Sequence, residues 1–213
     1  KGLRVAFSPD LGYAAIDPEV RAITTKAVHR FTELGCEVEE IHPDLPDPWD
    51  LVDKIWSSAF AGAYLKDFAK VRDQLDLGLV AVIEAGQQVS AAELSRAHQT
   101  RNEYYQRWHI FMQDYDLFLS PTLPVTAFIA GDHHPGWING QQTTYLDWTA
   151  FTYPFNATGQ PAATLPCGFA ANGLPVGLQV VGRHRDDATV LRASAAFEAL
   201  APWADQQPDL GKD

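Results

Sequence analysis

Hydrophobic positions follow two different periods in the first forty residues. Residues 3–7 form a short apolar run, which is typical of a buried strand. Asp17 and Pro18 then predict a helix start, because the acid can cap the first turn and proline suits the first helical position. Apolar residues recur at steps of three and four, as on one helix face: Val20, Ile23, Ala27, Phe31 and Leu34. Gly35 predicts the helix end, and residues 36–41 predict a second strand.

This strand–helix–strand order predicts an α/β fold in which parallel strands are joined by a right-handed crossover. Proline-rich residues 42–50 predict a loop. Residues 49–85 have a helical pattern, and we expect it to be interrupted at the glycines Gly62, Gly78 and Gly86.

The second half of the chain continues with a long helix and a short strand. Residues 90–93 (Ser-Ala-Ala-Glu) form a capping box that opens a helix towards residue 115. We expect its inner face to hold Leu94, Ala97, Tyr104, Trp108, Phe111 and Tyr115. Residues 116–120 predict a strand. Residues 130–144 are polar, glycine-rich and without period, which predicts a long loop of the kind that is often functional or mobile.

The last segment predicts a hairpin and a helix. Residues 162–165 and 177–181 flank an Asn172-Gly173 turn. Prolines do not donate to a sheet ladder, so Pro166 and Pro175 are expected to end regular pairing near the turn. Asp186 or Asp187 should cap a final helix that faces the sheet through Val190, Ser194, Phe197 and Leu200.

Composition excludes several classes of protein. The chain has 213 residues, enough for one large domain or two small ones, and 46% are hydrophobic, as in a globular core. A formal net charge of −11 argues against binding to nucleic acid or to an anionic membrane surface. No apolar run approaches the ~18 residues of a membrane span, and we predict a cytoplasmic protein. Cys36 and Cys167 are too few for a disulfide framework, and we expect both to be buried free thiols.

Two local patterns suggest chemistry at first. Asp132-His133-His134 has metal-binding residue types, but no third ligand stands at helical or hairpin spacing, so a surface loop is the favoured interpretation. Ser120 or Cys167 could act as a nucleophile with one of the seven histidines. Ser120 lacks the Gly-x-Ser-x-Gly elbow, and no histidine can be placed beside Cys167 from the sequence. We therefore predict no metal site and no nucleophile–base pair from these residues.

Residues 151–185 contain the most specific pattern of the chain. They read Phe-Thr-x-Pro-x-Asn, Gly-x-Pro-Ala, an apolar strand into Pro-Cys-Gly-Phe, and a second strand after the Asn-Gly turn. This closely resembles the C-terminal part of the amidase signature family, serine hydrolases that cleave carboxamides. Residues 2–10, 115–125 and 186–200 fit the same family in the same order. The resemblance implies an α/β/α architecture with a mixed central sheet flanked by helices, and hydrolysis without a cofactor.

The resemblance also implies that the catalytic residues lie elsewhere. Members of the family use a Ser–cis-Ser–Lys triad, which lies N-terminal to the region matched here. This chain has scattered serines, and its Ser57-Ser58 pair has no adjacent glycine. We expect residues 1–213 to be the C-terminal portion of a single amidase signature domain, inactive alone, which supplies scaffold and one wall of the pocket. The alternative is a catalytically inert α/β module that binds a small molecule or a partner.

Family members use the segment before Gly-x-Pro-Ala to wall the acyl pocket. Carried over by position, this implies substrate contacts from Thr149, Thr152, Phe155 and Trp148. Amidotransferase members have an acidic residue where Thr149 stands and a basic residue before the glycine matched by Gly86. In this chain the position of that basic residue falls among the apolar residues 80–83, so a neutral amide is favoured over glutamine as substrate.

Strand edges left open by a cut sheet are expected to cause self-association, with mobility at residues 130–150.

Overall fold

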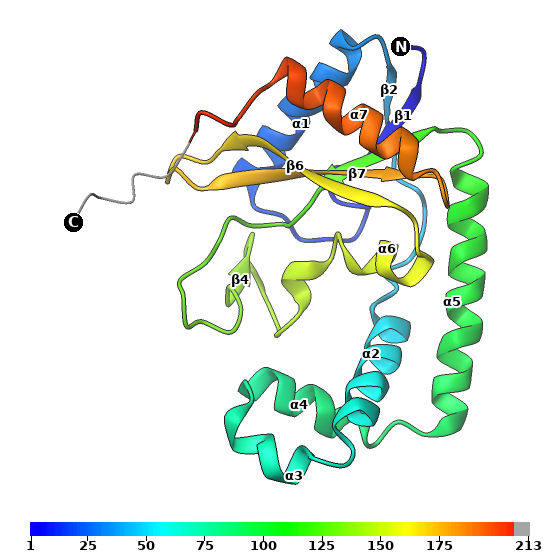
Figure 1. The fold of residues 1–213 in the computed structure, drawn as a ribbon, viewed down its shortest axis with the longest axis vertical. Coiled ribbons are helices and arrows are strands. Elements are labelled where there is room, and N and C mark those ends of the chain that lie inside the picture. Colours follow the sequence, from blue (N-terminus) through cyan, green and yellow to red (C-terminus); the bar gives the residue numbers. More distant parts are fainter. Residues whose placement is uncertain (207–213) are drawn as a thin grey trace.

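The fold is built on a mixed five-stranded sheet, as a computed structural model shows; the structure is described for residues 1–206. The strand order is β2-β1-β3-β7-β6. The strands span Glu37–Glu40 (β2), Arg4–Phe7 (β1), Leu117–Pro121 (β3), Pro175–Gly182 (β7) and Ala162–Phe169 (β6). β1 runs parallel to β2 and β3, whereas β7 runs antiparallel to β3 and β6. The predicted α/β class and the parallel pairing of the first two strands are confirmed (Figure 1).

Helices cover both faces of this sheet, because its strands carry apolar side chains on both sides. Along β1, Val5 and Phe7 point to one face and Ala6 to the other. The first face is covered by α1 (Pro18–Glu33) and α7 (Asp187–Leu200), which lie together above the sheet in Figure 1. The second face is covered by α5 (Ala91–Phe111) and the short α6 (Tyr153–Thr158). The sheet therefore lies between two helical layers.

The helix starts follow the capping signals in the sequence. Asp17 accepts hydrogen bonds from the backbone N–H groups of the first turn of α1. Ser90 and Glu93 form the reciprocal capping box of α5. Asp186 is the residue that caps α7, and it accepts from the N–H of Thr189. Each of these side chains satisfies a donor that a helix leaves free at its N-terminus. These predictions are confirmed.

The helical region between β2 and β3 extends away from the sheet (Figure 1). It contains α2 (Trp49–Tyr64), α3 (Phe68–Val71), a 3-10 turn at Arg72–Gln74 and α4 (Leu77–Gly86). The expected break at Gly62 is wrong, because this glycine lies inside α2. The helix break expected at Gly78 is also wrong, because Gly78 lies inside α4, which starts at Leu77 after its cap Asp76. A single glycine weakens a helix by only about 1 kcal/mol, which neighbouring helical residues can offset.

The segment at residues 130–144 has more structure than the sequence suggested. β4 (Trp137–Ile138) pairs antiparallel with β5 (Gln141–Gln142). Asn139 and Gly140 between them both have positive φ, at 47° and 77°. Asn-Gly is the preferred dipeptide for such a tight hairpin turn. The expectation of an irregular loop is therefore wrong at this hairpin, while the expected mobility stays a prediction.

The β6–β7 hairpin is more regular near its turn than expected. Phe169 pairs with Pro175, so pairing continues to the turn, with one irregularity between Pro166 and Gly168. Pro175 is the first residue of its strand, where a missing N–H costs least. β6 pairs only with β7 among the described residues, which leaves one of its edges without a strand partner. Self-association through such an edge stays a prediction.

The inner face of α7 differs from the expected one at two positions. Val190 and Phe197 are buried as predicted, together with Ala193 and Thr189. Ser194 is only half-buried and its hydroxyl donates to the carbonyl of Val190, while Leu200 is 37% exposed. Val190, Ala193 and Phe197 are three and four residues apart, so they share the buried face of the helix.

Within residues 1–206, no helix is both long enough and apolar enough to cross a membrane.

Candidate functional site

A cavity of about 520 Å3 lies beside the carboxyl end of β3. In sheets of this class, ligands bind outside the carboxyl ends of the strands, because loops diverge there. The parallel strands β1 and β3 end on this side. The residues around the cavity come from the segment after β3, from the β6–β7 hairpin and from the segment before α6, and include Thr122, Phe128, Trp148, Thr164, Val176 and Gly177. None of the residues lining it is charged.

Two threonine hydroxyls form the polar part of this cavity. Thr122 Oγ1 and Thr164 Oγ1 are 2.6 Å apart and share a hydrogen bond. Gly177 lies directly behind them, and a Cβ there would lie 2.8 and 2.9 Å from the Thr164 and Thr122 hydroxyl oxygens. The backbone N–H of Thr122 also donates to the carbonyl of Gly177, at 2.9 Å. Gly177 therefore provides the space that lets the two hydroxyls meet.

Trp148 forms an aromatic wall of the cavity. Its ring lies edge-to-face against Phe128, with centroids 5.5 Å apart. Its indole N–H donates to the carbonyl of Tyr145, at 2.9 Å, which fixes the orientation of the ring. The arrangement offers aromatic surface with two nearby hydroxyls, which suits a neutral, partly apolar group.

The other three predicted site residues do not line the cavity. Thr149 donates its hydroxyl to the carbonyl of Leu146 (2.6 Å), and Thr152 donates to the carbonyl of Thr149 (3.0 Å). Phe155 is 3% exposed and packs in the core, with its centroid 5.1 Å from that of Trp108. These side chains shape the segment that carries Trp148. Their role as substrate contacts stays a prediction.

The sequence analysis did not identify the threonine pair or a buried polar contact made by β7. Thr122 and Thr164 are 42 positions apart, so no local pattern could pair them. Gln179 on β7 is buried, and its amide Nε2 donates to Ser120 Oγ at 3.1 Å and to the carbonyl of Phe151 at 2.8 Å. A glutamine within an apolar strand was the available signal, since a buried amide needs partners.

Replacing Gln179 with leucine is expected to lower the free energy of unfolding by about 1–3 kcal/mol, because the carbonyl of Phe151 loses its buried donor. Urea unfolding followed by circular dichroism measures this loss. The matched control is Gln142→Leu on the exposed strand β5, which should change stability by less than about 0.5 kcal/mol. Equal stability of the Gln179→Leu and Gln142→Leu proteins would contradict a tethering role for Gln179.

The serines and histidines of the described residues do not form a nucleophile and base. Ser120 is fully buried and contacts Gln179 and a backbone carbonyl. Ser8 Oγ is 3.0 Å from His42 Nδ1, and Asp10 Oδ1 is 3.4 Å from that same nitrogen. A catalytic triad needs the alcohol and the acid on opposite ring nitrogens. This cluster therefore stabilises the turn after β1, where Ser8 Oγ also accepts from the N–H of Leu11.

The Cys167 thiol is poorly suited to nucleophilic attack, because burial raises its pKa to about 12. At pH 8 only on the order of one thiol in 10⁴ is then ionised, compared with a substantial fraction of a free cysteine. We expect Cys167 to react slowly with iodoacetamide in the folded protein and readily in urea, and native reactivity to rise as pH increases. Mass spectrometry of the Cys167 peptide measures this. Native labelling as fast as that of free cysteine would contradict the prediction.

The two adjacent histidines hold the 130–146 segment against different neighbours. His133 Nδ1 is 2.8 Å from Asp76 Oδ2, at the start of α4. His134 Nδ1 is 3.2 Å from Thr143 Oγ1. Among residues 1–206, no group of three potential metal ligands gathers around either imidazole. Both rings therefore make local contacts of this segment.

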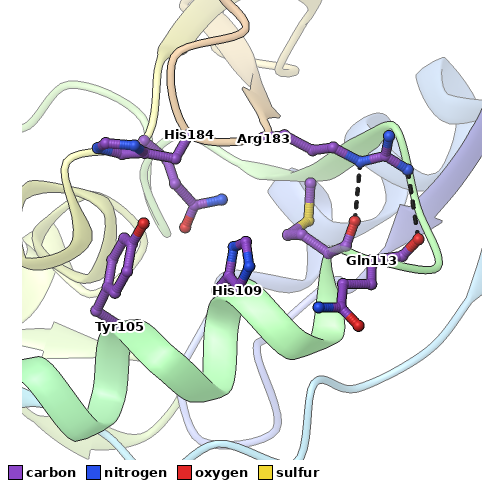
Figure 2. Close-up of a pocket in the computed structure, with 7 residues that line it drawn as sticks. Tyr105, His109, Gln113, Arg183 and His184 are labelled. Atoms are coloured by element: carbon purple, nitrogen blue, oxygen red, sulfur yellow. Dashed lines mark hydrogen bonds between the residues drawn. The ribbon is translucent and has the colours of Figure 1, made fainter.

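A second cavity, of about 420 Å3, opens between α5 and the turn that links β7 to α7. Tyr105 and His109 project from α5 towards this space, and His184 faces it from the opposite side (Figure 2). The rings of Tyr105 and His184 meet edge-on, with centroids 5.5 Å apart.

The charge of Arg183 in this second cavity is already engaged. Its Nε donates to the carbonyls of Met112 (3.0 Å) and Tyr115 (2.8 Å), and Nη2 donates to the carbonyl of Gln113. Asp116 lies 3.2 Å away as its ion-pair partner. A cation that satisfies the free carbonyls at a helix C-terminus stabilises that end. Arg183 therefore ties the end of α5 to β7, as Figure 2 shows.

Comparison with known proteins gives consistent matches along the chain. The family model described as Amidase matches residues 1–191. An acylamidase of Rhodococcus erythropolis is 42% identical over 98% of this chain and 44% of its own length. An amidase of Pseudomonas putida is 29% identical over 99% of this chain and 45% of its own length. The chain thus spans less than half the length of these relatives.

Solved structures agree with the fold. A bacterial aryl acylamidase of the amidase signature family superposes with a TM-score of 0.81 at 28% identity, over 95% of this chain and 44% of that one. A 6-aminohexanoate cyclic dimer hydrolase superposes with a TM-score of 0.83 at 24% identity, over 97% of this chain and 47% of that one. The second likeness concerns the fold alone.

Proposed function

Because this chain belongs to the amidase signature family, we propose that the protein hydrolyses a carboxamide to a carboxylic acid and ammonia or an amine. The observation that carries the proposal is the family match over residues 1–191, supported by the 42% identity to an acylamidase. The uncharged cavity beside β3 is consistent with a substrate of this kind, because an amide is neutral.

The reaction would proceed by acyl transfer at residues outside the 213 of this sequence. A serine alcohol would add to the amide carbon while a lysine accepts its proton through a second serine. The C–N bond would then break, the amine would leave with the proton, and water would release the acid from the acyl-enzyme. Backbone N–H groups would stabilise the oxyanion. Ser57 fits no such role, because it is 1% exposed within α2.

This chain would supply scaffold and one wall of the substrate pocket. Trp148 and Phe128 would contact an apolar part of the substrate, and the Thr122–Thr164 pair would offer a hydroxyl to its polar part. Thr149 stands where an acidic residue would be expected for a substrate with an α-ammonium group. A neutral aryl or alkyl amide is therefore the proposed substrate class, in preference to glutamine.

The test is turnover of 4′-nitroacetanilide and of glutamine by the full-length protein. We expect release of 4-nitroaniline, no release of ammonia from glutamine, and complete loss of activity after treatment with a serine-directed fluorophosphonate. Residues 1–213 alone should give no turnover. Glutamine turnover without anilide turnover would overturn the substrate class. Phosphonate-sensitive turnover by residues 1–213 alone would overturn the placement of the catalytic serine.

A further inference from the structure

A third cavity, of about 550 Å3, lies between α2, α4 and the segment before α6, away from the sheet. One face of α2 contributes Trp49, Asp53, Trp56 and Phe60, which follow one another at steps of four, three and four residues. Leu79 of α4 closes the opposite side. In Figure 1 these helices form the part of the molecule that extends beyond α6. The volume is in the range of small-molecule sites.

The aromatic walls of this cavity are held in place by their surroundings. Trp49 packs against Tyr153 of α6, with ring centroids 5.3 Å apart. Tyr145 donates its hydroxyl to Asp76 Oδ1, at 2.9 Å. Its ring lies over Gly78, where a Cβ would lie 2.2 Å from the ring. The missing side chain at Gly78 is thus what allows Tyr145 to close one side.

Asp53 is the single charged residue among those of residues 1–206 that line this cavity. It is half-buried, and burial raises the pKa of its carboxyl group. Its neighbours Asp50 and Lys54 pair with each other. Within residues 1–206, no hydrogen bond or ion pair reaches the Asp53 carboxylate. Lys54 is the nearby cation that favours the charged form of Asp53, but no ion pair joins the two side chains. A partly buried carboxylate in a mainly apolar and aromatic cavity is stabilised when a further cation joins it.

We propose that this cavity binds an amphiphilic organic cation, with its ammonium group beside Asp53 and its apolar body between Trp49, Trp56 and Leu79. The carboxylate and the faces of the tryptophans attract a cation by independent effects, charge and ring quadrupole. The net charge of −11 favours approach of cations over anions. The inference stands apart from the proposed hydrolysis, since it concerns binding only.

Calorimetric titration of the full-length protein with phenethylammonium tests the proposal, and phenethyl alcohol serves as its uncharged counterpart. We expect the ammonium compound to bind at least about tenfold more tightly than the alcohol. Asp53→Asn keeps the shape of the side chain and should weaken ammonium binding roughly 5- to 30-fold, with little change for the alcohol. The matched control is Asp50→Asn on the same helix, which removes an equal charge outside the cavity.

A second variant separates the ring contribution from the charge. Trp56→Leu keeps an apolar wall and removes the ring face. The affinity for phenethylammonium should therefore fall roughly 3- to 10-fold relative to the wild-type protein. Equal binding of both compounds, or equal losses in Asp53→Asn and Asp50→Asn, would overturn the proposal. If neither compound gave a heat of binding, the proposal would be overturned as well.

Discussion

Replacing Trp108 with alanine is expected to lower the free energy of unfolding by about 3–5 kcal/mol, the largest loss predicted for a single change in this chain. The indole is 1% exposed and is carried by α5. It meets Phe118 of β3 and Phe155 of α6 edge-on, with centroids 5.1 Å apart in both pairs. Alanine would leave a cavity where three elements join, and those elements cannot move together to fill it.

Urea and thermal unfolding measure this loss, and two further variants locate its cause. Trp108→Phe retains an aromatic ring and should cost less than about 1.5 kcal/mol. Trp137→Ala, at a position 64% exposed, should be within about 0.5 kcal/mol of wild type. A Trp108→Ala loss as small as that of Trp137→Ala would contradict the three-element core.

Replacing Gly86 with alanine is expected to cost about 2–4 kcal/mol, although the change adds one methyl group. A Cβ at this position would lie 1.9 Å from the carbonyl oxygen of Ser57 and 2.9 Å from the backbone nitrogen of Ser58. Both atoms belong to the backbone of α2, which has no rotamer to change. The methyl group would therefore force α4 away from α2 and open the cavity that these helices enclose.

The same substitution at Gly62 should have the opposite sign. Gly62 is exposed inside α2, and a Cβ there would have no neighbour within 4 Å. Alanine should stabilise the protein by about 0.5–1 kcal/mol, because it restricts the unfolded chain and suits a helix interior. Thermal unfolding of the two variants side by side makes the comparison. A neutral Gly86→Ala change would contradict the close contact of the two helices.

Much of the fold could be predicted because its signals are local. The Asp17 cap, the Ser90 capping box and the Asn172-Gly173 turn are each defined within a few residues. A short apolar run at residues 3–7 predicted a buried strand, and strands whose two faces are both covered have apolar residues on both sides. The expected helix breaks at Gly62 and Gly78 are wrong because helix propensity is weak compared with packing, whereas the break expected at Gly86 is confirmed, since α4 ends there. At position 86 only a glycine leaves room for the backbone of α2, and no local sequence pattern reveals this contact.

Less of the candidate site could be predicted than of the fold. The resemblance to the family motif implied four substrate-contacting residues. The structure places one of them, Trp148, at the cavity beside β3. Phe155 faces the core instead, because α6 turns that side towards α5. The Thr122–Thr164 pair and the Gln179 contact with Phe151 join residues far apart in the chain.

The sequence by itself determined the α/β class, the helix starts and the resemblance to amide hydrolases. Each depends on neighbouring residues or on the order of motifs along the chain. The tertiary structure alone decided which side chains meet, including the Trp148 wall and the Asp53 carboxylate among aromatic rings of α2 and the segment before α6. Such contacts depend on the positions of whole elements relative to one another, and packing fixes those positions only when the complete sheet and its helices have assembled.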